Sequence, residues 1–175
     1  MVRDVFETLD RLGIRYFVTG SVAASVYGVL RQTHDTDVVL DLTMADFGVL
    51  AHRFEQTHGV ADPIAYGDFA MASIIDRRTA DKVDIILHAS GRFEASAMAR
   101  RERHDVPGIG LVWVASVEDL ILAKLRWSEG TSELQLRDCA QLLAIVATGI
   151  DQGYLDHWAH RLGLQSLLAR VRNAP

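Results

Sequence analysis

Three aspartates stand where they could act together on a phosphorylated substrate. Asp35 and Asp37 open a strongly apolar run that is typical of a β-strand, and Asp84 lies inside a second such run, residues 83–87. Side chains two residues apart in a strand project from the same face, so Asp35 and Asp37 should converge. Neighbouring carboxylates raise each other's pKa unless a cation stands between them. Because Mg²⁺ prefers carboxylate oxygens and substrate phosphates, the spacing predicts a magnesium site.

The second run adds a third acid if the two strands are neighbours in one sheet. An acid inside an apolar strand is costly to bury unless it is paired or bound to a metal ion. Two Mg²⁺ ions held by Asp35, Asp37 and Asp84 could activate an attacking hydroxyl and stabilise a leaving pyrophosphate. Two alternatives stay open at this point. Asp35 and Asp37 could cap the turn before the strand, and Asp84 could be an edge-strand acid that faces water.

A glycine and a serine, Gly20 and Ser21, lie between a predicted strand and a predicted helix. Such a junction points unpaired backbone amides outward, and a helix N-terminus favours anions. A phosphate is therefore the natural occupant, with ordinary turn chemistry as the alternative. Arg31 lies on the loop before the acids. It could contact phosphate, steady Asp35 or lie in solvent.

The order of these features resembles the DNA polymerase beta-like nucleotidyltransferase superfamily. The shared order is glycine-serine, a helix, Asp-x-Asp at the start of a strand, and a later strand acid. The compact size resembles the minimal nucleotidyltransferases of that superfamily. The resemblance implies an α/β (α+β) fold with a short mixed sheet flanked by helices. It also implies that Gly20 and Ser21 hold a nucleoside triphosphate (NTP) while Asp35, Asp37 and Asp84 bind two magnesium ions.

A second resemblance involves residues 116–125, which are similar to a segment of abortive-infection-type toxin nucleotidyltransferases. There a helix lysine and a later aspartate complete the site, and the matching positions are Lys124 and Asp138. Lys124 is a cation on an otherwise apolar stretch, so it could reach a triphosphate as a point charge. It could instead extend to solvent. Asp138 could simply form an ion pair with Arg137 or Lys124.

Helices and strands that position these residues follow from hydrophobic periodicity and end signals. Thr43 and Ser116 are expected to cap helices. From Ser116 onward the pattern is helical only. We therefore predict a nucleotidyltransferase core over residues 1–115 and a C-terminal helical region over residues 116–175, packed on the core. The predicted helices cover residues 2–12, 21–30, 44–56, 92–103, 132–148, 152–162 and 165–172, and the predicted strands 15–19, 37–42, 69–77, 82–88 and 110–114.

Composition narrows the class of protein. The chain has 175 residues, a single cysteine and a net charge of −5. One cysteine excludes an intrachain disulfide. The net negative charge provides no general electrostatic attraction to nucleic acid, and it would suit a cationic substrate. No segment approaches the roughly 20 apolar residues of a membrane span, and the charged N-terminus is unlike a signal peptide. We therefore expect a cytoplasmic protein with no membrane contact.

These observations predict a magnesium-dependent nucleotidyltransferase, which moves a nucleoside monophosphate from an NTP to an acceptor hydroxyl. The acceptor stays open among RNA, a protein side chain and a small cationic molecule such as an aminoglycoside. The last choice draws on a looser similarity to antibiotic nucleotidyltransferases, whereas the second resemblance would fit a toxin–antitoxin system. The alternative from another class is a catalytically weak antitoxin or regulatory chain that binds a cognate partner protein.

Overall fold

One mixed sheet of seven strands forms the centre of the protein. The computed structural model describes residues 2–174 except residues 32, 34, 80, 89 and 90. The strands are β1 (Tyr16–Val18), β2 (Asp35–Leu40), β3 (His58–Tyr66), β4 (Phe69–Asp76), β5 (Lys82–His88), β6 (Glu102–Val106) and β7 (Gly110–Val114). They lie in the order β3-β4-β5-β2-β1-β7-β6. The pairs β2–β5 and β1–β7 are parallel, and the other pairs are antiparallel.

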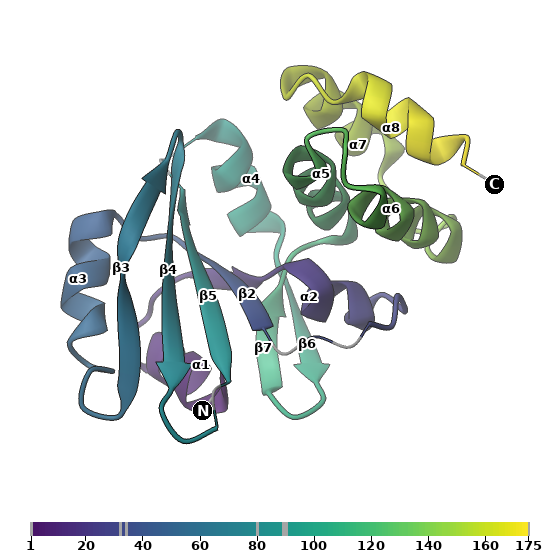
Figure 1. The fold of residues 1–175 in the computed structure, drawn as a ribbon. Helices are drawn as coiled ribbons and strands as arrows, with labels where there is room; N and C mark the ends of the chain where they lie inside the picture. The colour runs from purple at the N-terminus through teal and green to yellow at the C-terminus, as the bar shows by residue number, and fades with distance from the viewer. Residues whose placement is uncertain (1, 32, 34, 80, 89–90, 175) are drawn as a thin grey trace.

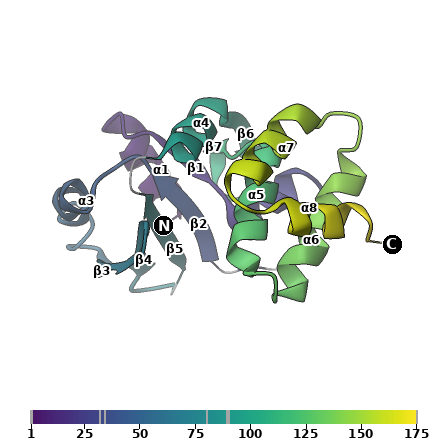
Figure 2. The ribbon, with the colours of Figure 1, turned by 90° about the horizontal axis from the view of Figure 1, so that it is seen from above.

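Helices flank this sheet and then form a group of their own. They are α1 (Val2–Arg11), α2 (Gly20–Val26), α3 (Met44–Ala51), α4 (Arg92–Arg100), α5 (Val117–Ser128), α6 (Glu133–Ile145), α7 (Gln152–Arg161) and α8 (Gln165–Arg172). Helices α1 and α4 lie on the same side of the sheet (Figures 1 and 2), while α5 to α8 gather beside it. Helix α5 packs against α2, α6 and α7. The predicted α/β fold class is confirmed.

Local sequence explains where several of these elements begin and end. Helix α1 buries Val5, Phe6 and Leu9, which share one face at helical spacing. Both predicted caps are confirmed, because the side chains of Thr43 and Ser116 accept hydrogen bonds from the amides three residues later. A capping residue satisfies amides that a helix start leaves unpaired. These caps therefore fix the starts of α3 and α5.

Two predictions about the elements are wrong. The helix predicted over residues 92–103 ends at Arg100, and Glu102–Val106 forms strand β6 instead. Strand β3 has no counterpart among the predicted elements. Both are edge strands, and edge strands tolerate charges, bulges and proline that hide the usual alternation. Strand β3 carries Pro63 and a register shift between Ala61 and Ile64.

A buried polar network ties the C-terminal helices to α4. The Glu118 carboxylate accepts from Arg100 at 2.8 Å and from the Asp151 amide at 2.8 Å. Asp119 accepts from the Tyr154 hydroxyl at 2.7 Å and from Ser116 at 2.6 Å. Buried carboxylates need such partners, so α5 holds its place on the core through paired charge as well as apolar packing.

Across the part of the chain that the structure describes, none of the helices has the length and apolar character needed to span a membrane.

Candidate active site

Gly20 brings the start of helix α2 against Asp37. Its φ is 65°, within the left-handed region that glycine tolerates best. A Cβ atom here would overlap the Asp37 carboxylate, with the Asp37 Cγ only 2.8 Å away. The amide of Thr19 donates to the carbonyl oxygen of Asp37 at 2.9 Å. Glycine is therefore required both for the backbone conformation and for the close approach of the acid.

The first turn of α2 leaves its backbone amides without a side-chain cap. Thr19 is the N-cap, and its side chain makes no capping hydrogen bond. Ser21 lies half-buried in this turn. Amides at a helix start carry partial positive charge and suit a phosphate. The predicted phosphate contact of Gly20 and Ser21 thus has a suitable position, and the contact itself stays a prediction.

The three predicted acids lie on one face of the sheet, across two neighbouring strands. In the parallel pairing of β2 with β5, Asp37 stands opposite Asp84 and Asp35 stands opposite Lys82. Alternate residues of a strand share a face, so these four side chains project together. Burial raises the pKa of Asp37, and the carboxylates of Asp84 and Asp35 raise it further. Like charges are therefore concentrated around Asp37.

Lys82 is a member of this site that the sequence argument missed. Its Nζ atom lies 2.8 Å from Asp84 Oδ2 and 3.5 Å from Asp35 Oδ2. The hydrogen bond to Asp84 is the main reason that the pKa of Lys82 is raised. The signal was present in the spacing, because Lys82 precedes Asp84 by two residues and must share its face of β5.

The oxygen donors fit a hard cation such as Mg²⁺ at Asp37. Asp37 lies against the uncapped start of α2, where substrate phosphate would complete the coordination. Asp84 is more fully engaged, because Ser73 Oγ donates to its Oδ1 at 2.6 Å and Lys82 contacts its Oδ2. Within the described residues, no three Asp, Glu, His or Cys side chains are grouped so that they could hold a metal ion. The three-acid magnesium site therefore stays a prediction.

A cavity of about 230 Å³ opens beside Asp37. Its lining joins the turn before α2 to helices α5 and α6. Polar groups and apolar surface both contribute, as in small-molecule sites in general. The lining residues are Thr19, Gly20, Asp37, Met71, Ile86, Ala123, Lys124, Trp127, Ser132 and Gln135.

Lys124 lines this cavity although its side chain is only 4% exposed. Its Nζ donates to Asp138 Oδ2 at 2.8 Å and to Gln135 Oε1 at 3.1 Å. The alternative in which Lys124 extends to solvent is therefore wrong. Asp138 is 2% exposed, and its predicted ion pair with Lys124 is observed. A buried lysine needs such a partner, because burial disfavours the charged form.

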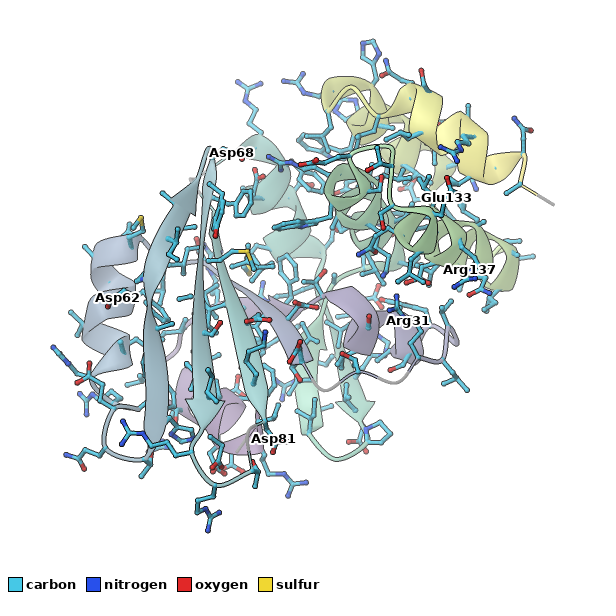
Figure 3. All side chains as sticks on the ribbon, in the orientation of Figure 1. Arg31, Asp62, Asp68, Asp81, Glu133 and Arg137 are labelled. Carbon is cyan, nitrogen blue, oxygen red and sulfur yellow. The ribbon has the colours of Figure 1, made fainter. Side chains whose placement is uncertain are left out.

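Arg31 joins the same carboxylate from the loop after α2. Its Nη1 donates to Asp138 Oδ2 at 3.1 Å, and Figure 3 shows Arg31 next to helix α6. The sequence predicts contact with phosphate or with Asp35, so this partner differs from the prediction. Two cations share one carboxylate here. The group of Arg31, Lys124 and Asp138 therefore carries a net positive charge, and Lys124 brings positive charge to the cavity that Asp37 also lines.

Comparisons with known proteins place this arrangement in a known fold. No protein-family model matches the chain, and no curated protein matches it. The solution structure of the antibiotic-resistance factor ANT(2'')-Ia is similar at 14% identity and a TM-score of 0.60, covering 99% of this chain and 96% of that one. A candidate nucleotidyltransferase from Thermotoga maritima has 17% identity and a TM-score of 0.57, with coverage of 78% and 88%.

The lincosamide antibiotic adenylyltransferase LnuA gives a TM-score of 0.53 at 10% identity, covering 81% of this chain and 94% of that one. Sequence identities this low establish the fold and leave the activity to be argued from the site. The mixed sheet, the glycine turn beside Asp37 and the helices around the cavity agree with the fold implied by the resemblance. The chain therefore has the fold that these solved nucleotidyltransferases share.

Proposed function

We propose that this chain is a magnesium-dependent nucleotidyltransferase that transfers a nucleoside monophosphate from an NTP to a hydroxyl of a small-molecule acceptor. The observation that carries the proposal is the packing of Asp37 on Gly20 at a cavity lined by Lys124. A carboxylate, helix-start amides and an ammonium thus surround one space. These are the groups that bind a magnesium-bound triphosphate.

Each residue has a role in this proposal. The amides of Gly20 and Ser21 bind the triphosphate, and Lys124 contacts it from the other side of the cavity. Asp138 and Arg31 position Lys124. Asp37 would hold Mg²⁺ at the cavity, within the acidic face that it forms with Asp35 and Asp84, and the bound ion would neutralise charge on the transferring phosphoryl group.

The reaction joins the acceptor oxygen to the α-phosphorus of the NTP. As that O–P bond forms, the bond to the bridging oxygen breaks and pyrophosphate leaves. The proton of the acceptor hydroxyl passes through water to the departing pyrophosphate. Catalysis then consists mainly of positioning and charge stabilisation by the groups around the cavity.

A small cationic molecule is the acceptor that we favour. ANT(2'')-Ia is known in complex with adenylyl-2''-tobramycin, and LnuA with lincomycin bound. The net charge of −5 would also attract a cation. RNA is the second candidate. It is favoured by the buried Lys124–Asp138 pair, whose positions match the abortive-infection-type toxins. In that case a cognate antitoxin would be the partner protein.

Label transfer tests the proposal directly. The purified chain is incubated with each α-labelled NTP and Mg²⁺, together with tobramycin, lincomycin or total tRNA. We expect labelled product with one acceptor class, dependent on Mg²⁺ and absent with Asp37→Asn. Transfer to tRNA alone would select the toxin-type function. Absence of both transfer and NTP binding would contradict the proposal and favour the non-catalytic partner protein.

Lys124 provides a prediction that separates binding from folding. Lys124→Met removes a charge-assisted contact with the triphosphate, so NTP affinity should fall about ten-fold or more, measured by calorimetric titration. The same change leaves Asp138 buried with one cation fewer. The free energy of unfolding should therefore fall by about 3 kcal/mol, measured by urea denaturation.

The double variant Lys124→Met/Asp138→Leu is the control for the stability loss. It removes both buried charges, so most of the lost stability should return while NTP affinity stays low. Wild-type affinity in Lys124→Met would exclude the lysine from the nucleotide site. Recovery of affinity in the double variant would show that the lysine acts only by maintaining the fold.

A further inference from the structure

Lys82 occupies a position where a metal ion would otherwise be expected. Its ammonium lies 2.8 Å from Asp84 Oδ2 and 3.5 Å from Asp35 Oδ2, and so bridges two of the three acids. This placement follows from the parallel register of β2 and β5, in which Lys82 stands directly opposite Asp35. The Lys82 side chain is 33% exposed, so the surrounding protein partly shields its ion pairs from water.

The same contacts divide the acids into two groups. Both oxygens of Asp84 are engaged, one by the Ser73 hydroxyl at 2.6 Å and the other by Lys82. Asp37 instead lies against Gly20 and lines the cavity. Within the described residues, no three carboxylates converge on one point. An acid whose oxygens are already paired is a poor additional ligand, whereas Asp37 faces the space that the substrate would fill.

We propose that the Lys82 ammonium takes the place of one of the two divalent cations, so that the site binds a single Mg²⁺ ion at Asp37 together with the triphosphate. The fixed ammonium already neutralises part of the charge of Asp35 and Asp84, so less negative charge remains there to attract a second divalent ion. The inference rests on the proposed nucleotidyltransferase function and concerns how many metal ions serve it.

Counting bound Mn²⁺ tests this inference without measuring activity. Mn²⁺ replaces Mg²⁺ and is titrated by electron paramagnetic resonance, with the chain saturated by a non-hydrolysable NTP analogue. We expect one Mn²⁺ per bound nucleotide in the wild type. Lys82→Met keeps the length of the side chain and removes its charge, so two Mn²⁺ ions should bind. Lys82→Arg keeps a cation beside Asp84 and should retain one.

Each outcome decides a different point. Two Mn²⁺ ions in the wild type would overturn the inference while supporting the proposed function, and this result needs no variant to fold. One Mn²⁺ in a folded Lys82→Met would also overturn it, since the charge would then not exclude the second ion. A folded wild type that binds neither Mn²⁺ nor the analogue would overturn the inference together with the proposed function.

Discussion

Replacing Asp37 with asparagine is expected to abolish nucleotidyl transfer while making the metal-free chain more stable. Asp37 is the acid that lines the cavity, and loss of even an indirect metal contact typically costs 10- to 100-fold in metal affinity or activity. Loss of a direct ligand should therefore reduce transfer by at least about 100-fold. Label transfer and calorimetric titration with a magnesium-bound NTP measure the two effects.

The gain in stability should depend on pH in a defined direction. Burial and the charges of Asp84 and Asp35 hold the pKa of Asp37 above the ordinary value of 3.8. The folded chain therefore binds this proton more tightly than the unfolded chain. The free energy of unfolding of the wild type therefore falls as the pH rises from about 3.8 through the raised pKa of Asp37 in the folded chain. Above that pKa, the folded chain carries a buried charge on Asp37 that Asp84 and Asp35 repel. Asparagine has no such charge.

The melting temperatures of wild type and Asp37→Asn should thus converge near pH 4 and separate toward neutral pH, in the presence of a metal chelator. Relief of about 1 kcal/mol would correspond to about 2–4 °C for a chain of this size. Asp62→Asn is a matched control, because that exposed acid lies on the edge strand β3, which β4 separates from the strands of the three site acids. Equal melting temperatures at pH 7, or unchanged nucleotide affinity, would remove Asp37 from its assigned role.

The central part of the fold could be predicted because its signals are local. Strands β2 and β5 lie in the middle of the sheet, so apolar runs mark them clearly. Asp35 and Asp37 stand at the start of the first run, and Asp84 interrupts the second. Edge strands lack such signals. Strand β6 has the sequence Glu-Arg-His-Asp-Val and pairs only with β7, and its charges are compatible with an edge yet look helical or loop-like in sequence.

The electrostatics of the site could be predicted only in part, because partners come from distant segments. Lys82 was overlooked although its spacing from Asp84 places both on one face of β5. Its contact with Asp35 depends on the parallel register of two strands. The contact between Arg31 and Asp138 joins residues 107 positions apart, and no sequence pattern specifies that pairing. Residue types therefore identified the chemistry, while tertiary packing decided which charges meet.

Gly20→Ala is expected to disrupt the site more severely than the added methyl group suggests. The backbone at Gly20 has a φ of 65°, and a non-glycine residue in this region costs about 1–2 kcal/mol. The new Cβ would also overlap the Asp37 carboxylate, and such overpacking adds about 1–3 kcal/mol. Stability measured by urea denaturation should fall by the sum of the two costs. Transfer should be lost, because Asp37 must leave the cavity.

Gly13→Ala separates backbone strain from the clash. Gly13 has almost the same φ, 66°, and a Cβ there would meet nothing within 4 Å. Gly13→Ala should therefore lower the free energy of unfolding only by the backbone strain, about 1–2 kcal/mol, and should leave nucleotidyl transfer intact. The double variant Gly20→Ala/Asp37→Gly removes the clash, so it should be more stable than Gly20→Ala while transfer stays absent. If Gly20→Ala and Gly13→Ala lose the same stability and both retain transfer, the close approach of Gly20 to Asp37 has no part in the activity. A larger loss for Gly20→Ala that the double variant reverses would show that glycine is needed there to admit the carboxylate.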